Sequence, residues 1–304
     1  MNIFITGATG FIGGSVAARF MAEGYHVRGL VRTEAHAERL RSLGVTPVIG
    51  TLDDADILTR EAQRADAVVN AASSDNVPAV EALLNALAGS GKAFIHTSGS
   101  SVVGDDARGE WTSEKIFDED TIYTPAPEKA ERAALDKLII DAATRSVRSI
   151  ILCNTMIYGN GLGLNPFSVQ IPPLVAQARK SGIARFVGQG VNIWSNVHIE
   201  DVVELYLLAL KKAPAGSFYY VENGEASYKD ITTAIAQRLQ LSAPQPWPVE
   251  EAIKEWGFGH AVYSFGSNSR VSAKRARTDL GWTPKHTSVV GWIKDNMLIR
   301  EGSL

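Results

Sequence analysis

Short apolar runs alternate with amphipathic stretches along the first half of the chain. The apolar runs end near Gly, Asp or Ser and predict strands at Asn2–Thr6, His26–Val31, Thr46–Ile49, Ala67–Asn70, Ala93–Thr97 and Arg148–Cys153. Between them, apolar residues recur at three and four positions, which predicts helices at Ile12–Glu23, Thr33–Leu43, Pro78–Ser90 and Glu128–Thr144. This alternation favours an α/β fold, a doubly wound parallel sheet covered by helices on both faces.

The pattern changes after Tyr158. Gly159–Pro166 is glycine-rich and polar, and Pro172-Pro173 opens a helical run that extends to Lys180. Further helices are predicted at Asp201–Lys211 and Tyr228–Gln240, without the regular alternation of the first half. We therefore expect a first domain at residues 1–158 and a smaller α+β lobe at residues 159–304, interleaved at their edges.

A glycine loop follows the first predicted strand and runs directly into a helix. Gly7, Gly10 and Gly13 have the spacing G-x-x-G-x-x-G. Glycines let the backbone turn tightly and approach a pyrophosphate closely, while the helix N-terminus supplies free N–H donors. An ordinary glycine turn is the alternative, but the flanking strand and helix favour a dinucleotide site. Its predicted members are Thr6, Gly7, Thr9, Gly10, Phe11, Ile12 and Gly13.

The end of the second predicted strand indicates which dinucleotide is bound. Arg32 stands where a site preferring NAD usually has an acidic residue for the ribose hydroxyls. A guanidinium favours a 2′-phosphate instead, and His36 and Arg39 follow at helical spacing. NADP(H) is therefore the predicted cofactor; the alternative is an Arg32 that only points into water.

Composition narrows the function classes. The 304 residues are 45% hydrophobic and 21% charged, with a net charge of −3 and no long basic run, so a nucleic-acid or anionic-membrane partner is not expected. Cys153 is the sole cysteine, and the six histidines have no paired spacing, so no disulfide or metal site is predicted. No leader pattern or apolar stretch of about 18 residues is visible, which favours a cytoplasmic protein.

Several motifs along nearly the whole chain resemble one superfamily. They are Thr6-Gly7-Ala8-Thr9-Gly10-Phe11-Ile12-Gly13, Asn70-Ala71-Ala72, Ser98 with Ser100 and Ser101, Tyr158-Gly159, Val197-His198-Ile199-Glu200-Asp201-Val202 and Leu280-Gly281-Trp282-Thr283-Pro284. Together they are similar to the extended and atypical short-chain dehydrogenases/reductases, the group of the NAD(P)-dependent epimerase/dehydratases. The resemblance implies a Rossmann-like cofactor domain and a smaller C-terminal lobe that closes over a small-molecule substrate.

The resemblance also implies further cofactor neighbours. Asn70, Ala71 and Ala72 would line the cofactor under its ribose and phosphates. The family's G-D-L-x-D reads Gly50-Thr51-Leu52-Asp53-Asp54 here, so Thr51 replaces the aspartate beside the adenine. Threonine can still accept a hydrogen bond, and Thr51 and Leu52 are expected near the adenine, with Asp53 as a candidate cap of the next helix.

The family's catalytic Y-x-x-x-K pair is absent. The most natural register lays Glu128 on the tyrosine, Arg132 on the lysine and Asp136 on a trailing acid, all on one helix face. Arg132 could supply the positive field of the lysine, although it does not readily donate its proton. Glu128 cannot simply replace a phenol.

A proton donor must then come from elsewhere if a carbonyl is reduced. Tyr123, just before the helix, is the leading candidate; Tyr158, Lys129 and Glu128 are weaker ones, and simple aromatic packing of Tyr123 is the alternative. The resemblance implies that Ser98, with Ser100 or Ser101 nearby, polarises the substrate oxygen; capping of a turn is the alternative.

Three functions remain open. The first is an NADP(H)-dependent oxidoreductase that exchanges hydride with a small carbonyl or alcohol substrate. The second is a sugar-nucleotide epimerase or dehydratase, which would normally carry the missing pair. The third is a non-catalytic protein that senses NADP and binds other proteins. Family members often pair through helices equivalent to Pro78–Ser90 and Glu128–Thr144, so both a homodimer and a monomer fit the sequence.

Overall fold

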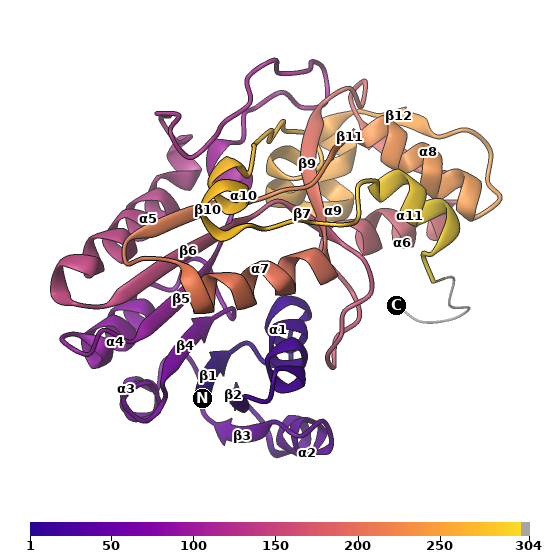
Figure 1. The fold of residues 1–304 in the computed structure, drawn as a ribbon. Helices are drawn as coiled ribbons and strands as arrows, with labels where there is room; N and C mark the ends of the chain where they lie inside the picture. Colours follow the sequence, from indigo (N-terminus) through magenta and orange to yellow (C-terminus); the bar gives the residue numbers. More distant parts are fainter. Residues whose placement is uncertain (299–304) are drawn as a thin grey trace.

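A seven-stranded parallel sheet forms the centre of the molecule. The structure is a computed structural model, and it describes residues 1–298. The strand order is β10-β6-β5-β4-β1-β2-β3, so the order reverses between β1 and β4 (Figure 1). The strands are β1 (Asn2–Thr6), β2 (His26–Val31), β3 (Thr46–Ile49), β4 (Ala67–Asn70), β5 (Ala93–Gly99), β6 (Arg148–Asn154) and β10 (Ser217–Val221).

Helices cover both faces of this sheet. On one face α1 packs against α7, and on the other α4 packs against α3 and α5 (Figure 1). The bounds are α1 (Phe11–Ala22), α2 (Glu34–Ser42), α3 (Ala55–Arg64), α4 (Val77–Leu87), α5 (Ala130–Asp141) and α7 (Ile199–Lys212). This parallel sheet with helices on both faces confirms the predicted doubly wound, Rossmann-like fold.

In the large sheet and the helices that cover it, the predicted bounds shift slightly and one strand is new. The helix predicted at Glu128–Thr144 is α5 between two short 3-10 turns, Pro127–Lys129 and Ala142–Arg145. The helix expected after Asp53 is α3; its bounds were not predicted because six of its ten residues are polar, although it buries Leu58 and Ala62. Strand β10 was missed, because its pairing partner β6 lies far away in the sequence.

The second lobe has its own apolar core. Its small sheets pair β7 (Met156–Tyr158), β9 (Ile193–His198) and β11 (Glu225–Ser227), and β8 (Arg185–Val187) with β12 (Gln245–Trp247). Around them lie α6 (Ile171–Ser181), α8 (Tyr228–Arg238), α9 (Val249–Tyr263) and α11 (Val289–Asp295). These elements bury a cluster separate from the core of the large sheet. Among the described residues, no helix is both long and apolar enough to cross a membrane.

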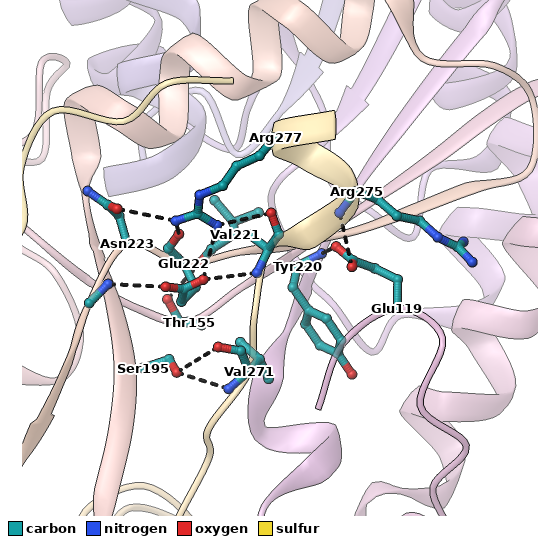
Figure 2. A network of polar contacts seen from close by, with 12 residues as sticks. Glu119, Thr155, Ser195, Tyr220, Val221, Glu222, Asn223, Val271, Arg275 and Arg277 are labelled. Carbon is teal, nitrogen blue, oxygen red and sulfur yellow. Dashed lines mark hydrogen bonds and ion pairs between the residues drawn. The ribbon is translucent and has the colours of Figure 1, made fainter. Parts of the chain in front are cut away.

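The chain returns to the large sheet after entering the second lobe. Helix α7, β10 and α10 (Lys274–Leu280) contribute buried residues to the core of that sheet. A polar network holds this return in place (Figure 2): the Glu119 carboxylate accepts from backbone N–H groups of β10 and α10, and Glu222 accepts from the Arg277 guanidinium at 3.2 Å. The division at residue 158 stays a prediction, and the two halves share the large sheet.

Candidate functional site

The glycine loop after β1 is close-packed against the loop after β4. Gly7 has φ +76°, and a Cβ there would lie 2.7 Å from the backbone of Ala71. A Cβ on Gly13 would lie 2.3 Å from the carbonyl oxygen of Gly7, and Gly10 N–H donates to that same oxygen at 2.9 Å. Only glycine fits these positions, so the backbone itself forms the surface that a ligand would meet.

The N-terminus of α1 fits the diphosphate of a dinucleotide. Gly10 is its N-cap residue and offers no side-chain acceptor, and the first turn contains no acidic residue. The first N–H groups of the helix therefore keep unpaired donors and the positive end of the helix dipole. The residues present thus suit a diphosphate held by backbone alone.

Thr6 and Asn70 fix the floor under this loop. The Thr6 hydroxyl donates to Asn70 Oδ1 at 2.6 Å, and Asn70 Nδ2 lies 3.1 Å from His96 Nδ1. Burial, followed by repulsion from Arg132, lowers the pKa of His96 to about 4, so its ring stays neutral. These two hydrogen bonds fix the Asn70 side chain and with it the start of the segment Ala71-Ala72. Ala71 lines the cavity described below.

The predicted phosphate-recognition residues lie on the surface after β2. Arg32 is exposed, and within residues 1–298 its guanidinium has no ion-pair partner within 4 Å. Thr33 caps α2, and its hydroxyl lies 3.0 Å from His36 Nδ1. A free, exposed guanidinium at this strand end is compatible with a 2′-phosphate.

The loop after β3 requires one correction. Asp54, not Asp53, is the N-cap residue of α3, and its carboxylate accepts from both the backbone N–H and the hydroxyl of Thr51, at 2.6 and 2.8 Å. These bonds lower the pKa of Asp54. Asp53 was the expected cap, because the sequence does not show which of the two neighbouring aspartates is the residue that precedes the helix. Leu52 packs against the core of the large sheet.

A cavity of about 570 Å³ opens at the carboxyl ends of the central strands. Parallel α/β sheets bind ligands at this edge, where the strand order reverses. The cavity joins the glycine loop, the end of β5, the start of α5 and part of α9. Its lining includes Gly10, Phe11, Ile12, Ala71, Ser98, Gly99, Ser101, Lys129, Arg132, Asn154, Thr155, Trp194, His260 and Tyr263.

Ser98 is turned toward a buried acid. Its hydroxyl donates to Asp136 Oδ2 at 2.8 Å, and burial raises the pKa of Asp136 to about 7. Ser100 is buried and bonded to the Ser269 hydroxyl at 2.9 Å. Ser98 lines the cavity, as predicted for a substrate-polarising residue, but its own proton is directed to Asp136; its catalytic role stays a prediction.

Arg132 forms the positive centre of the cavity wall. Its guanidinium donates to both carboxylate oxygens of Asp75, at 2.7 and 2.6 Å, and to the Ser101 hydroxyl at 2.9 Å. It passes over Gly99, where a Cβ would lie 3.4 Å from Arg132 Nη1. Because Ser101 accepts from Arg132, its own hydroxyl proton is free to donate toward the cavity.

Tyr123 is not among the residues that line the cavity. It packs against the large core, with its ring edge-on to Phe117 at 6.0 Å, and burial raises the pKa of its phenol. The sequence-based choice of Tyr123 as proton donor therefore gains no support from its position. The phenol that does line the cavity is Tyr263, on α9, and Lys129 lies over its ring. No sequence signal marked Tyr263, because it is more than a hundred residues from the motifs it faces.

Two histidines that are scattered in the sequence meet at the lobe boundary. The rings of His198 and His286 stack with centroids 3.9 Å apart, and Glu200 is close to both. His286 already faces two carboxylates, at 3.3 Å from Glu200 and 3.1 Å from Asp201. The His198 Nδ1 accepts the Glu200 N–H at 3.3 Å. Each ring thus has protein partners, and the cluster fixes the start of α7 to the chain before α11.

The comparisons with known proteins agree with this geometry. The model of the NAD dependent epimerase/dehydratase family matches residues 3–221. The chain belongs to this family. An uncharacterised protein of Schizosaccharomyces pombe is 31% identical over 95% of this chain and 97% of its own length. The oxidase ucsJ of an Acremonium species is 31% identical over 93% of this chain and 92% of its own.

A relative with a named carbonyl chemistry is more distant. The 4-hydroxy-2-methyl-3-oxo-4-farnesyl-3,4-dihydroquinoline-1-oxide ketoreductase of Stigmatella aurantiaca is 24% identical over 96% of this chain and 94% of its own. Among solved structures, dTDP-glucose 4,6-dehydratase from Bacillus anthracis, in complex with NAD, superimposes with a TM-score of 0.76. At 20% identity over 97% of each chain, that likeness shows the fold alone.

Proposed function

We propose that the protein is an NADP(H)-dependent oxidoreductase that exchanges hydride with a small carbonyl or alcohol substrate. The observation that carries this proposal is the continuity of the cavity. One space of about 570 Å³ connects the glycine loop at Gly10 with the guanidinium and hydroxyl of Arg132 and Ser101. A volume of this size suits a small molecule beside the reactive end of a dinucleotide.

Different residues of the chain would bind the cofactor and stabilise the reacting oxygen. The N-terminus of α1 would hold the diphosphate, and Arg32 would pair with the 2′-phosphate through its forked donors. A bound reduced nicotinamide supplies the hydride. Arg132 and Ser101 would face the substrate oxygen, where a positive field and a hydroxyl donor stabilise the negative charge that develops there. The named relatives with an oxidase and a ketoreductase activity support this class of reaction.

A second candidate function rests on the absent dyad. Glu128, in the place of the tyrosine, is exposed, and the Arg132 fork is already neutralised by Asp75. A protein of this kind could bind NADP as a sensor without turning it over. Binding and turnover must therefore be measured separately.

Calorimetric titration with NADPH and NADH tests the cofactor assignment. NADPH should bind more tightly, and Arg32→Ala should weaken NADPH roughly tenfold or more while leaving NADH unchanged, because a charged hydrogen-bond pair contributes about 1.5–3 kcal/mol. Arg41→Ala is the matched control, since Arg41 is also exposed on this surface but pairs with Glu34. Equal affinity of the wild type for both cofactors would overturn the NADP assignment.

A carbonyl screen tests the reaction. Oxidation of NADPH that depends on an added aldehyde or ketone is the expected result. Tight NADPH binding with no turnover against any carbonyl class would favour the sensor.

A further inference from the structure

One phenol lines the cavity among the residues that the structure describes, and it comes from the second lobe. Tyr263 ends α9, which is broken at Gly257, where φ is +75° and ψ is 161°. This break redirects the last turns of α9, so that Gly259, His260 and Tyr263 all line the cavity. A glycine permits this conformation without strain.

Tyr263 is anchored from behind. Its carbonyl oxygen accepts from the Ser267 hydroxyl at 3.0 Å, and its ring meets Phe258 edge-on at 5.6 Å. Two residues later, Phe265 is buried against Trp256 with ring centroids 4.8 Å apart. The backbone that carries the phenol is therefore fixed to the core of the second lobe.

Lys129 approaches the same ring from the opposite half of the molecule. Its ammonium lies 5.2 Å from the centroid of the Tyr263 ring, within the range of a cation–π contact. Lys129 also lines the cavity, and within residues 1–298 no carboxylate lies within 4 Å of its ammonium. Burial, followed by repulsion from Arg132, lowers the pKa of Lys129. A phenol and a lysine ammonium thus meet at one wall of the cavity, each from a different lobe.

We propose that Tyr263 is the proton donor of this site and that Lys129 is its cationic positioning partner, so that a pair assembled between the lobes replaces the missing Y-x-x-x-K. This inference rests on the proposed function, because it assigns a residue to the reduction of a carbonyl. It differs from the sequence-based assignment to Tyr123, which lies outside the cavity lining.

The proton balance of the step is simple. When hydride from the reduced nicotinamide reaches the carbonyl carbon, the C=O π electrons move to the oxygen. That oxygen forms a bond to the Tyr263 proton, the phenol O–H bond breaks, and the phenolate remains beside the Lys129 ammonium. Water then returns a proton to the phenolate. The products are the alcohol and the oxidised nicotinamide.

The surroundings of Tyr263 keep the phenol protonated before the reaction. Burial, a hydrogen bond to the Glu128 carboxylate and the negative charges of Glu128 and Asp106 together raise the pKa of Tyr263 to about 12, and Arg108 opposes this rise. At neutral pH the phenol is therefore protonated, which is the form that can donate a proton to a substrate oxygen.

Tyr263→Phe removes the hydroxyl and keeps the ring over which Lys129 lies. We expect NADPH affinity, measured by calorimetry, to stay within about twofold, while carbonyl-dependent NADPH oxidation falls at least 100-fold, as removal of a general acid predicts. Tyr25→Phe is the matched control, because Tyr25 packs against α1 away from the cavity and should keep the wild-type rate. Near wild-type turnover in Tyr263→Phe, with loss in Tyr123→Phe, would overturn the inference.

A second readout does not depend on turnover. Melting temperatures of Lys129→Met, Tyr263→Leu and the double variant, all without cofactor, measure whether the two side chains interact. We expect the two shifts to be non-additive; additive shifts would refute the pairing. If the wild type binds NADPH but reduces no carbonyl, the proposed function fails together with the catalytic role of Tyr263. If the wild type reduces a carbonyl and Tyr263→Phe does so at the wild-type rate, the inference fails and the proposed function stands.

Discussion

The glycine loop and the opposite wall of the cavity are built in different ways. The glycine loop is one continuous segment, Gly7–Gly13, whose shape follows from its own backbone and from Ala71 below it. The opposite wall combines the end of β5, the start of α5 and the last turns of α9, and the contacts between these segments span up to half of the chain.

The comparison shows where catalytic ability can change without loss of the fold. A glycine in the loop cannot be exchanged, because a Cβ would meet backbone at under 3 Å at both Gly7 and Gly13. The side chains on the opposite wall are not constrained in that way. In the register expected from the sequence, Glu128 and Arg132 take the tyrosine and lysine positions of the family, and α5 packs against β5 and β6. Cofactor binding and proton transfer should therefore respond independently to mutation.

The largest expected effect is on the loop side. Gly13→Ala places a Cβ 2.3 Å from the carbonyl oxygen of Gly7, so the loop or α1 must move. We expect NADPH affinity to fall at least 100-fold by calorimetry, since the diphosphate depends on the position of backbone N–H groups.

Gly291→Ala is the control for Gly13→Ala. Gly291 lies in α11 with a negative φ, where a Cβ would meet no backbone atom and only the Ser288 side chain, at 3.3 Å. It should retain both affinity and melting temperature. Retained NADPH affinity in Gly13→Ala would show that the close approach of Gly7 and Gly13 is not needed for the cofactor.

The fold could be predicted from the sequence where local pattern and burial coincide. Strands β1 to β4 have the predicted bounds, because each is a short apolar run flanked by polar or turn-forming residues; β1 and β4 are also buried almost throughout, whereas β3 lies at the sheet edge. Strand β10 was missed and the bounds of helix α3 were not predicted, for opposite reasons. Five residues paired to a distant strand carry no periodic signal, and α3 shows a helical burial pattern beneath a mostly polar sequence.

The candidate site could be predicted only where its residues are close together in the sequence. The glycine motif predicted the loop after β1 and the start of α1. Asp136 was placed on the right face of α5 by spacing, but the sequence could not show that it holds Ser98. Tyr263 could not be found at all, because its place at the cavity depends on the break at Gly257 and on the docking of the second lobe. Contacts of this kind form only when segments that are distant in the sequence come together in the folded chain.

A smaller effect is expected from Arg132 on the opposite wall. Arg132→Lys keeps the positive charge but loses the planar guanidinium, whose N–H groups donate to Asp75 and Ser101 at the same time. We expect turnover with the best carbonyl substrate to fall about tenfold, with NADPH affinity within about threefold, because the developing charge loses an oriented donor. Arg270→Lys is the matched control: Arg270 makes a comparable fork to Glu225 and one bond to a backbone carbonyl, outside the cavity. Equal losses in both variants would point to stability rather than to the site.

The smallest expected effect is a pH dependence of stability that arises on the same wall. Burial raises the pKa of Asp136 from 3.8 to about 7, and its Oδ1 has no hydrogen-bond partner among the described residues. Between these two values the folded protein keeps a proton that the unfolded chain has released, so stability falls as pH rises. From pH 5.5 to 6.5 the wild type should lose about 1 kcal/mol of unfolding free energy that Asp136→Asn retains, because an amide oxygen still accepts from Ser98.

Denaturant unfolding at both pH values measures this difference between Asp136→Asn and the wild type. Asp141→Asn is the control, since Asp141 lies on the same helix but is exposed and pairs with Lys137. Parallel pH dependence of Asp136→Asn and the wild type would show that Asp136 titrates alike in the folded and unfolded states. The glycine loop has no ionisable side chain, so a pH-dependent difference that vanishes in Asp136→Asn while NADPH affinity is unchanged would locate this sensitivity in the opposite wall alone.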